Sequence, residues 1–224
     1  MATSGDSIGP WTLHEKLGVG GNATVWRASH KDGEVVALKL INTTKAQHEP
    51  YRRFIQEVQF LQKLGDFPGV LPLLDAHLPE RPKSTDRAWL AMPVATPIAH
   101  VLADAPLDTV VAALAEIAET LARLAERDVG HRDIKPGNLY ELDGRWLIGD
   151  FGLVAGPDLA ELTVSGKKLG PAHYTAYELI LDPVNADPLP ADVYSFAKTL
   201  FVLATGLTYP PEGHQPASIH GLDR

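Results

Sequence analysis

The sequence predicts an α+β fold in two lobes, in which a small antiparallel β-sheet lobe with one main helix precedes a larger, mostly helical lobe. Apolar residues alternate with glycines over residues 11–41, which is typical of short antiparallel strands. Apolar residues then recur at helical spacing over residues 107–124, for about five turns. Neither repeats nor low-complexity segments interrupt this order.

The first lobe begins with three predicted strands in residues 11–41. The pair Asp32-Gly33 marks a hairpin turn between the second and the third of them. Two more strands are predicted in residues 67–74 and 88–94, on either side of a polar loop at residues 79–87.

A helix is predicted over residues 51–64 of the first lobe. Phe54, Val58 and Leu61 follow one another at spacings of four and three residues and form one apolar face. Glu57 lies on the same face, where a carboxylate needs a partner.

The second lobe begins with the long helix of residues 107–124. A short hairpin follows over residues 139–148, with Asp143-Gly144 as its turn. The apolar segment 193–207 is interrupted by polar residues and is shorter than the roughly 20 residues that span a membrane, so it predicts a buried core helix.

These elements divide the chain into five segments. We expect a flexible tail at 1–10, the first lobe at 11–93, a hinge at 94–97, the second lobe at 98–208, and a tail or linker at 209–224. The cleft between the lobes is the default place for a binding site.

Composition excludes several classes of function. The chain has 28 acidic and 20 basic residues and no cluster of Lys and Arg, which argues against a nucleic-acid partner. It has no cysteine, so disulfides and thiolate metal sites are excluded, and a reducing cytoplasm is the simplest location. The first ten residues do not resemble a signal peptide. The nine histidines are scattered, so oxygen ligands are expected for any metal.

A glycine-rich segment separates the first two strands. It includes Gly18, Val19, Gly20, Gly21 and Val25. Backbone N–H groups without side chains beside them can approach a polyphosphate closely. A hairpin turn rich in glycine explains the same segment when it is taken alone.

Lys39 lies in the middle of an apolar strand, where an ammonium group is costly to bury without an anion. Glu57 presents the opposite charge on the apolar helix face. Pairing them satisfies both groups and leaves the ammonium able to contact phosphate oxygens. Two independent surface residues are the alternative.

The polar segment His131-Arg132-Asp133-Ile134-Lys135-Pro136-Gly137-Asn138 directly follows the long helix, and Asp150-Phe151-Gly152 follows the hairpin. In this order the two segments resemble the catalytic loop and the magnesium-binding motif of the protein kinase family. With lysine at position 135, the first segment resembles the catalytic loop of the serine/threonine subclass. The resemblance to the family extends from Trp11 to about Gly206.

The resemblance implies a role for each of these side chains. Lys39 would hold the nucleotide phosphates and Glu57 would hold Lys39, while Asp133 would orient the attacking hydroxyl and Lys135 would neutralise the transferred phosphoryl group. Asn138 and Asp150 would bind Mg²⁺, with Mn²⁺ as an alternative.

Further residues follow from the same resemblance. An adenine pocket would comprise Val25, Ala37, Met92, Pro93, Ala95 and Leu139. His131 is expected to pack rather than to catalyse. Asp192 would brace the catalytic loop, although a helix N-terminal acid explains it nearly as well.

Activation-segment residues imply regulation and also depart from the family. Arg132 would bind a phosphate group added to Thr163 or Ser165. Pro171 stands where the family usually has a threonine, and Tyr177 stands where it usually has a proline, which puts peptide docking in doubt.

We therefore expect a cytoplasmic signalling enzyme that transfers the γ-phosphate of Mg-ATP to Ser or Thr hydroxyls of proteins, including its own activation segment. The alternatives are an ATP-binding pseudokinase that acts as an interaction module, and a small-molecule phosphotransferase. The family's last helices are missing, so self-association or a further C-terminal region would cover the exposed surface of the second lobe.

Overall fold

The computed structural model describes residues 2–157, 159 and 173–211. The chain divides into two compact units, and each is described by itself below. The N-terminal unit comprises Met1–Phe67 and Leu71–Ala95, and the C-terminal unit comprises Pro68–Val70 and Thr96–Arg224.

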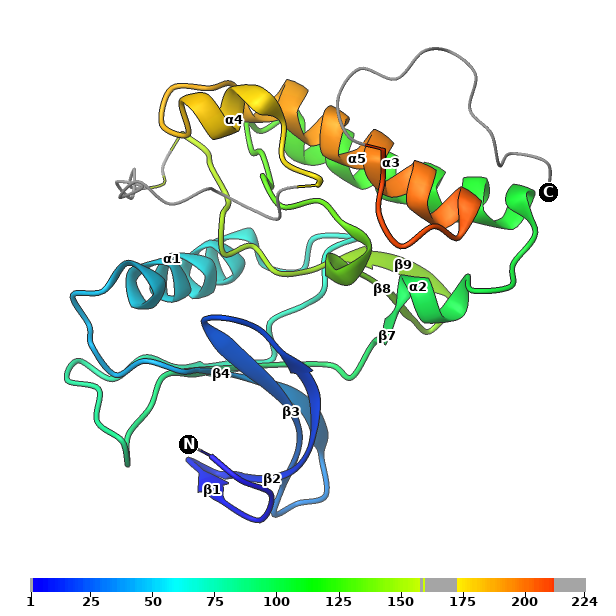
Figure 1. Cartoon of the computed structure of the whole chain (residues 1–224). Coiled ribbons are helices and arrows are strands. Elements are labelled where there is room, and N and C mark those ends of the chain that lie inside the picture. Colours follow the sequence, from blue (N-terminus) through cyan, green and yellow to red (C-terminus); the bar gives the residue numbers. More distant parts are fainter. Residues whose placement is uncertain (1, 158, 160–172, 212–224) are drawn as a thin grey trace. The chain divides into compact units, whose positions relative to one another are not determined.

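The N-terminal unit is built on a six-stranded antiparallel sheet (Figure 1). Its strands in spatial order are β1 (Ser7–Ile8), β2 (Trp11–Val19), β3 (Ala23–His30), β4 (Val35–Ile41), β6 (Trp89–Met92) and β5 (Asp75–His77). The three strands predicted within residues 11–41 are confirmed as β2, β3 and β4. Gly33 has a positive φ of 91° in the turn between β3 and β4, a conformation that glycine adopts without strain.

Two predictions for this unit need correction. The expected tail of residues 1–10 contains β1, which pairs with β2 through Ser7 and Ile8, and Ile8 packs against the buried core. The strand expected in residues 67–74 lies instead at Asp75–His77. The prolines of the 67–74 segment and the positive φ of Gly69, 88°, prevent continuous strand pairing there.

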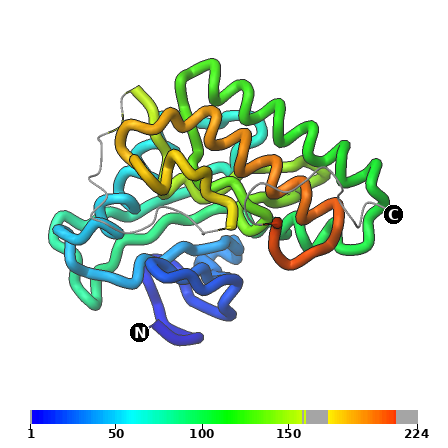
Figure 2. Tube along the Cα trace, turned by 45° about the horizontal axis from the view of Figure 1, so that its top comes forward, coloured from blue at the N-terminus to red at the C-terminus, as the bar shows by residue number. Residues whose placement is uncertain are grey.

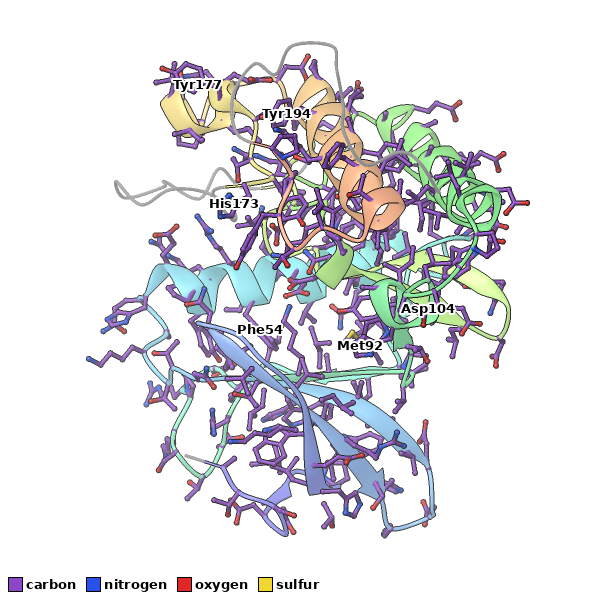
Figure 3. The ribbon with its side chains drawn as sticks, turned by 45° about the vertical axis from the view of Figure 1, so that its right-hand side comes forward. Phe54, Met92, Asp104, His173, Tyr177 and Tyr194 are labelled. Carbon is purple, nitrogen blue, oxygen red and sulfur yellow. The ribbon has the colours of Figure 1, made fainter. Side chains whose placement is uncertain are left out.

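Helix α1 (Glu49–Leu64) covers one face of this sheet. Phe54 of α1 and Met92 of β6 belong to the core that this face and the helix share (Figure 3). Gly65 ends the helix with a positive φ of 66°. The opposite face carries a separate core that contains three of the four tryptophans, Trp11, Trp26 and Trp89.

The C-terminal unit is mostly helical. Its elements are β7 (Thr96–Pro97), α2 (Ile98–Val101), α3 (Leu107–Ala125), the short 3₁₀ helix η1 (Pro136–Asn138), β8 (Leu139–Leu142), β9 (Arg145–Ile148), α4 (Tyr177–Leu181) and α5 (Pro188–Thr205). The long helices α3 and α5 run side by side, as Figures 1 and 2 show. The small sheet has the order β7-β8-β9. The helix predicted over 107–124 and the hairpin predicted over 139–148 are confirmed.

The structure differs from the sequence predictions at two places in this unit. Helix α5 begins at Pro188, five residues before the predicted segment 193–207, because Asp187 caps it by accepting a hydrogen bond from the Leu189 N–H at 2.9 Å. Residues 96 and 97 of the expected hinge form β7, which pairs with β8. Within the described part of the chain, no helix has the length and apolar character needed to span a membrane.

Candidate active site

The glycine-rich segment connects β2 to β3 in the N-terminal unit. The Gly20 N–H donates to the Ala23 carbonyl at 2.9 Å, which closes the turn. A Cβ atom at Gly18 or Gly21 would meet no other atom within 4 Å, and neither glycine has a positive φ. Neither packing nor backbone conformation therefore requires glycine at these two positions, which favours close approach of a ligand as the reason for them.

Lys39 and Glu57 form a buried ion pair in the same unit. The Lys39 Nζ lies 2.7 Å from Oε1 and 2.8 Å from Oε2 of Glu57. Only 12% of the Lys39 side chain and 3% of the Glu57 side chain are exposed. The sequence prediction that these residues pair is confirmed, because β4 directs Lys39 toward the face that α1 covers.

Three residues of the expected adenine pocket share this face of the sheet. Val25 lies opposite Lys39 in the pairing of β3 with β4, and Ala37 lies opposite Met92 in the pairing of β4 with β6. Side chains of directly opposed residues lie on one face, and residues 37 and 39 lie on the same face of β4. Pro93 and Ala95 follow β6, and Leu139 is a fully buried residue at the start of β8 in the C-terminal unit.

Two polar side chains of the C-terminal unit, those of Lys135 and Asn138, converge on Asp133. The Lys135 Nζ donates to Oδ2 of Asp133 at 2.7 Å. The Asn138 Nδ2 donates to the same oxygen at 2.9 Å and to the Asp133 main-chain carbonyl at 2.8 Å. The other carboxylate oxygen, Oδ1, is buried and has no hydrogen-bond partner among the described residues. A buried acceptor without a partner is costly, so this oxygen marks a place where a donor is expected to bind.

Asp192 of α5 holds the backbone of this loop. Its Oδ2 accepts from the His131 N–H at 2.6 Å and its Oδ1 accepts from the Arg132 N–H at 2.7 Å. Arg132 has a φ of 67°, a left-handed conformation that a non-glycine residue adopts only when its surroundings enforce it. Burial raises the pKa of the Asp192 carboxyl above its ordinary value, although the nearby His131 and the two N–H groups act in the opposite direction.

The bracing role expected for Asp192 is thereby confirmed. It is not the N-terminal acid of its helix, because α5 begins at Pro188, four residues earlier.

His131 is completely buried, as expected for a packing residue. Its ring meets the Phe151 ring edge-on, with 4.6 Å between the centroids. Its Nε2 lies 3.1 Å from the Gly149 carbonyl oxygen, which fixes the orientation of the ring.

The hairpin β8–β9 brings Asn138 and Asp150 together. Leu139 pairs with Ile148, and the Gly149 N–H donates to the Asn138 carbonyl at 2.9 Å, so Asp150 lies one residue beyond a direct backbone contact with Asn138. Both amide hydrogens of Asn138 point to Asp133, which leaves the Asn138 Oδ1 for a cation. An amide oxygen and a carboxylate suit Mg²⁺, so these residues fit the metal that the sequence predicts.

The expected regulatory residues fall into two groups. Arg132 donates to the main-chain carbonyl of Pro183. Thr163, Ser165 and Pro171 lie outside the described residues.

Tyr177 is the first residue of α4 and is 68% exposed (Figure 3). The exposed fraction of Leu181, at the other end of the same helix, is 66%.

One contributor to the site could not be read from the sequence. The main chain of Gly149 contacts both His131, through its carbonyl, and Asn138, through its N–H. A main-chain contact leaves no residue-type signal, and only the pairing of β8 with β9 reveals it.

Comparison with known proteins also identifies the protein kinase family, over most of the chain. The protein kinase domain model matches residues 11–222. A DNA damage-responsive serine/threonine-protein kinase, RqkA of Deinococcus radiodurans, is 36% identical over 88% of this chain and 30% of its own length. The serine/threonine-protein kinase AfsK of Streptomyces coelicolor is 28% identical over 91% of this chain and 25% of its own length. PknL of Mycobacterium tuberculosis, also a serine/threonine-protein kinase, is 31% identical over 93% of this chain and 52% of its own length.

The chain thus spans between a quarter and about half of these relatives. The family model nevertheless extends over both units, and it includes the Lys39–Glu57 pair and the cluster around Asp133. The sequence motifs, the two structural units and these similarities together show that the chain belongs to the protein kinase family.

Proposed function

We propose that this chain is a serine/threonine protein kinase that transfers the γ-phosphate of ATP to a protein hydroxyl. The observation that carries the proposal is the environment of Asp133. One of its carboxylate oxygens is held by Lys135 and Asn138, while the other is buried without a partner among the described residues. A hydroxyl group is the donor that this free oxygen suits, because it brings one hydrogen and no charge.

The N-terminal unit supplies the nucleotide contacts in this proposal. Backbone N–H groups around Gly18 and Gly21 bind phosphate oxygens, and Lys39 contacts the α- and β-phosphates while Glu57 keeps its ammonium in place. The adenine ring lies against Val25, Ala37 and Met92, which share the Lys39 face of the sheet.

Asn138 and Asp150 hold the metal in this proposal. Mg²⁺, when bound, neutralises charge on the β- and γ-phosphate oxygens. The Asn138 side chain also positions Asp133 through its Nδ2, so one residue links the metal site to the group that orients the substrate.

The transfer itself needs no covalent intermediate with the protein. The hydroxyl oxygen of the substrate forms a bond to the γ-phosphorus as the bond between that phosphorus and its bridging oxygen breaks, and ADP leaves. Asp133 Oδ1 accepts the hydrogen bond of the hydroxyl and then its proton. Lys135, 2.7 Å from Asp133, offsets negative charge on the phosphoryl group.

A protein substrate is favoured over a small molecule by the surface of α4. Tyr177 and Leu181 are 68% and 66% exposed. Exposed apolar side chains that directly follow the activation segment in the sequence suit contact with a polypeptide. The chain's own activation segment is one candidate substrate within this proposal.

Phosphate transfer from radiolabelled Mg-ATP to a generic basic protein and to the chain itself tests the proposal. Asp133→Asn should abolish transfer and retain nucleotide binding, because the amide keeps the shape of the side chain but cannot take the proton. Asp143→Asn is the matched control. It neutralises an acid in the turn between β8 and β9, where φ is 52° and asparagine is tolerated, and transfer should persist.

Two other outcomes would support one of the alternative functions. Nucleotide binding without transfer in the unmodified chain would support an ATP-binding interaction module instead. Transfer to aminoglycoside- or choline-like alcohols but to no protein would support a small-molecule phosphotransferase.

A further inference from the structure

A cavity lies in the N-terminal unit, on the face of the sheet opposite Lys39. Its volume is about 530 Å³, and strands β2, β3 and β4 contribute Lys16, Thr24, Trp26 and Leu40 to its lining. Arg87, the last residue of the 79–87 loop, also lines the cavity. Cavities of roughly 300–1,000 Å³ accommodate small organic ligands.

Strand register places this cavity away from the proposed nucleotide contacts. Thr24 lies opposite Leu40, and Val25 lies opposite Lys39, in the pairing of β3 with β4. Successive residues of a strand point to opposite faces, so Thr24, Trp26 and Leu40 face away from Val25 and Lys39. The cavity therefore lies on the face of the sheet opposite Lys39, although the same strands form both sites and Val19 of the glycine-rich segment belongs to its lining.

The lining contains a buried donor without an acceptor. Trp26 is only 3% exposed, and its indole N–H has no hydrogen-bond partner among the described residues. An unsatisfied buried donor is costly, and a ligand oxygen that reached this N–H from the cavity would remove the cost.

Two cations in the lining have no carboxylate partner within the described part of the chain. The Lys16 Nζ lies over the Trp26 ring, 5.2 Å from its centroid. Arg87 donates to the main-chain carbonyl of Ile41, and burial lowers the pKa of its guanidinium, which indicates a partly desolvated charge without a compensating anion.

The described lining contains fewer acidic than basic side chains. Asp6 is the one acid among the described lining residues, and its carboxylate already accepts a hydrogen bond from the Thr3 N–H at 2.8 Å. The lining thus carries two cations and one anion, and it favours a ligand with negative charge.

We propose that this cavity binds a small organic carboxylate with a flat apolar body. The carboxylate would lie between Lys16 and Arg87 and accept the Trp26 N–H, while its apolar body would contact Leu40 and the indole ring. A charge-assisted bond to each cation and removal of one unsatisfied donor together favour an anion over a neutral molecule of the same shape.

Binding of 1-naphthoate, measured by isothermal titration calorimetry on the full chain, tests this proposal. Its neutral amide, 1-naphthamide, is the matched control for charge. We expect 1-naphthoate to bind with a dissociation constant below about 1 mM, and 1-naphthamide to bind at least about tenfold more weakly, as expected for loss of charge-assisted hydrogen bonds. Equal binding of the two probes, or no binding of 1-naphthoate at 10-fold higher concentration, about 10 mM, would overturn the proposal.

Three substitutions locate the binding site. Lys16→Gln and Arg87→Gln should each weaken 1-naphthoate binding about fivefold or more, and Trp26→Phe, which keeps an aromatic ring but removes the N–H, should weaken it about threefold. Lys31→Gln removes an exposed cation in the turn between β3 and β4, outside the cavity, and should leave binding unchanged.

Lys16 is exposed, so Lys16→Gln remains informative if either of the other two variants fails to fold. Binding that is unaffected by Lys16→Gln, or reduced equally by Lys31→Gln, would show that the probe binds elsewhere and that the proposal is wrong.

Discussion

The ammonium of Lys39 contacts both carboxylate oxygens of Glu57, at 2.7 and 2.8 Å, within an otherwise apolar interface between α1 and the sheet. Neither residue can be removed alone without leaving a buried charge. The pair therefore links the stability of the N-terminal unit to the geometry of the group that is proposed to hold the nucleotide.

Lys39→Met should destabilise the chain by about 3–5 kcal/mol, because Glu57 would remain buried and charged without its partner. Lys39→Met combined with Glu57→Leu should recover most of this loss, since the double variant has no buried charge. Urea unfolding of Lys39→Met, of Glu57→Leu and of the double variant measures these losses. A double variant as unstable as the sum of the singles would show that the two side chains act independently.

Gly21→Val should weaken nucleotide binding while leaving the fold intact. A Cβ at Gly21 meets nothing within 4 Å and the residue has no positive φ, so the unfolding free energy should change by no more than about 0.5 kcal/mol. A bulky side chain would keep the backbone away from phosphate oxygens, and we expect nucleotide affinity to fall about tenfold or more.

Fluorescent-nucleotide titration and urea unfolding of the same samples separate these two effects. Unchanged affinity in a folded Gly21→Val protein would contradict the phosphate-binding role and would favour a plain hairpin turn.

Asp192→Asn should change how stability depends on pH. Burial raises the folded-state pKa of Asp192 above the ordinary value of 3.8, so the folded chain binds the proton more tightly than the unfolded chain. The stability contributed by this protonation is present below the unfolded pKa and is lost as pH rises through the raised folded pKa.

The unfolding free energy of the unmodified chain minus that of Asp192→Asn should therefore be largest at the acidic end of the range and fall toward neutral pH. Denaturant unfolding at a series of pH values from about 4 upward provides the measurement. A difference that grows with pH would mean that the ionised carboxylate is stabilised in the fold, mainly by its bonds to His131 and Arg132.

Gly69→Ala should be strongly destabilising. Its φ is 88°, and an added Cβ would lie 2.0 Å from the Oγ1 of Thr120, a buried residue of α3. Strain and overlap together predict a loss of about 2–4 kcal/mol.

Gly144→Ala is the matched control for the backbone contribution. Its φ is 75°, but a Cβ there would meet no atom within 4 Å, so only about 1 kcal/mol should be lost. Thermal unfolding of the two variants compares the values. Equal destabilisation would show that the contact with Thr120 relaxes without cost.

Local sequence patterns were sufficient to predict the main secondary-structure elements and the order of the chemical motifs. Periodicity located α1, α3 and the strands β2 to β4, and turn residues located the β8–β9 hairpin, because these signals depend on neighbours within a few positions. The pairing of Lys39 with Glu57 was also predictable, since each residue places a charge in an apolar element and requires an opposite charge nearby.

Contacts between residues far apart in the chain became visible only in the three-dimensional structure. Asp192 meets His131 and Arg132 across some sixty positions, and only the packing of α5 shows that it braces a strained loop rather than capping a helix. The unpaired Asp133 oxygen and the cavity beside Trp26 are likewise invisible in the sequence, because an unsatisfied atom is defined by what surrounds it in three dimensions.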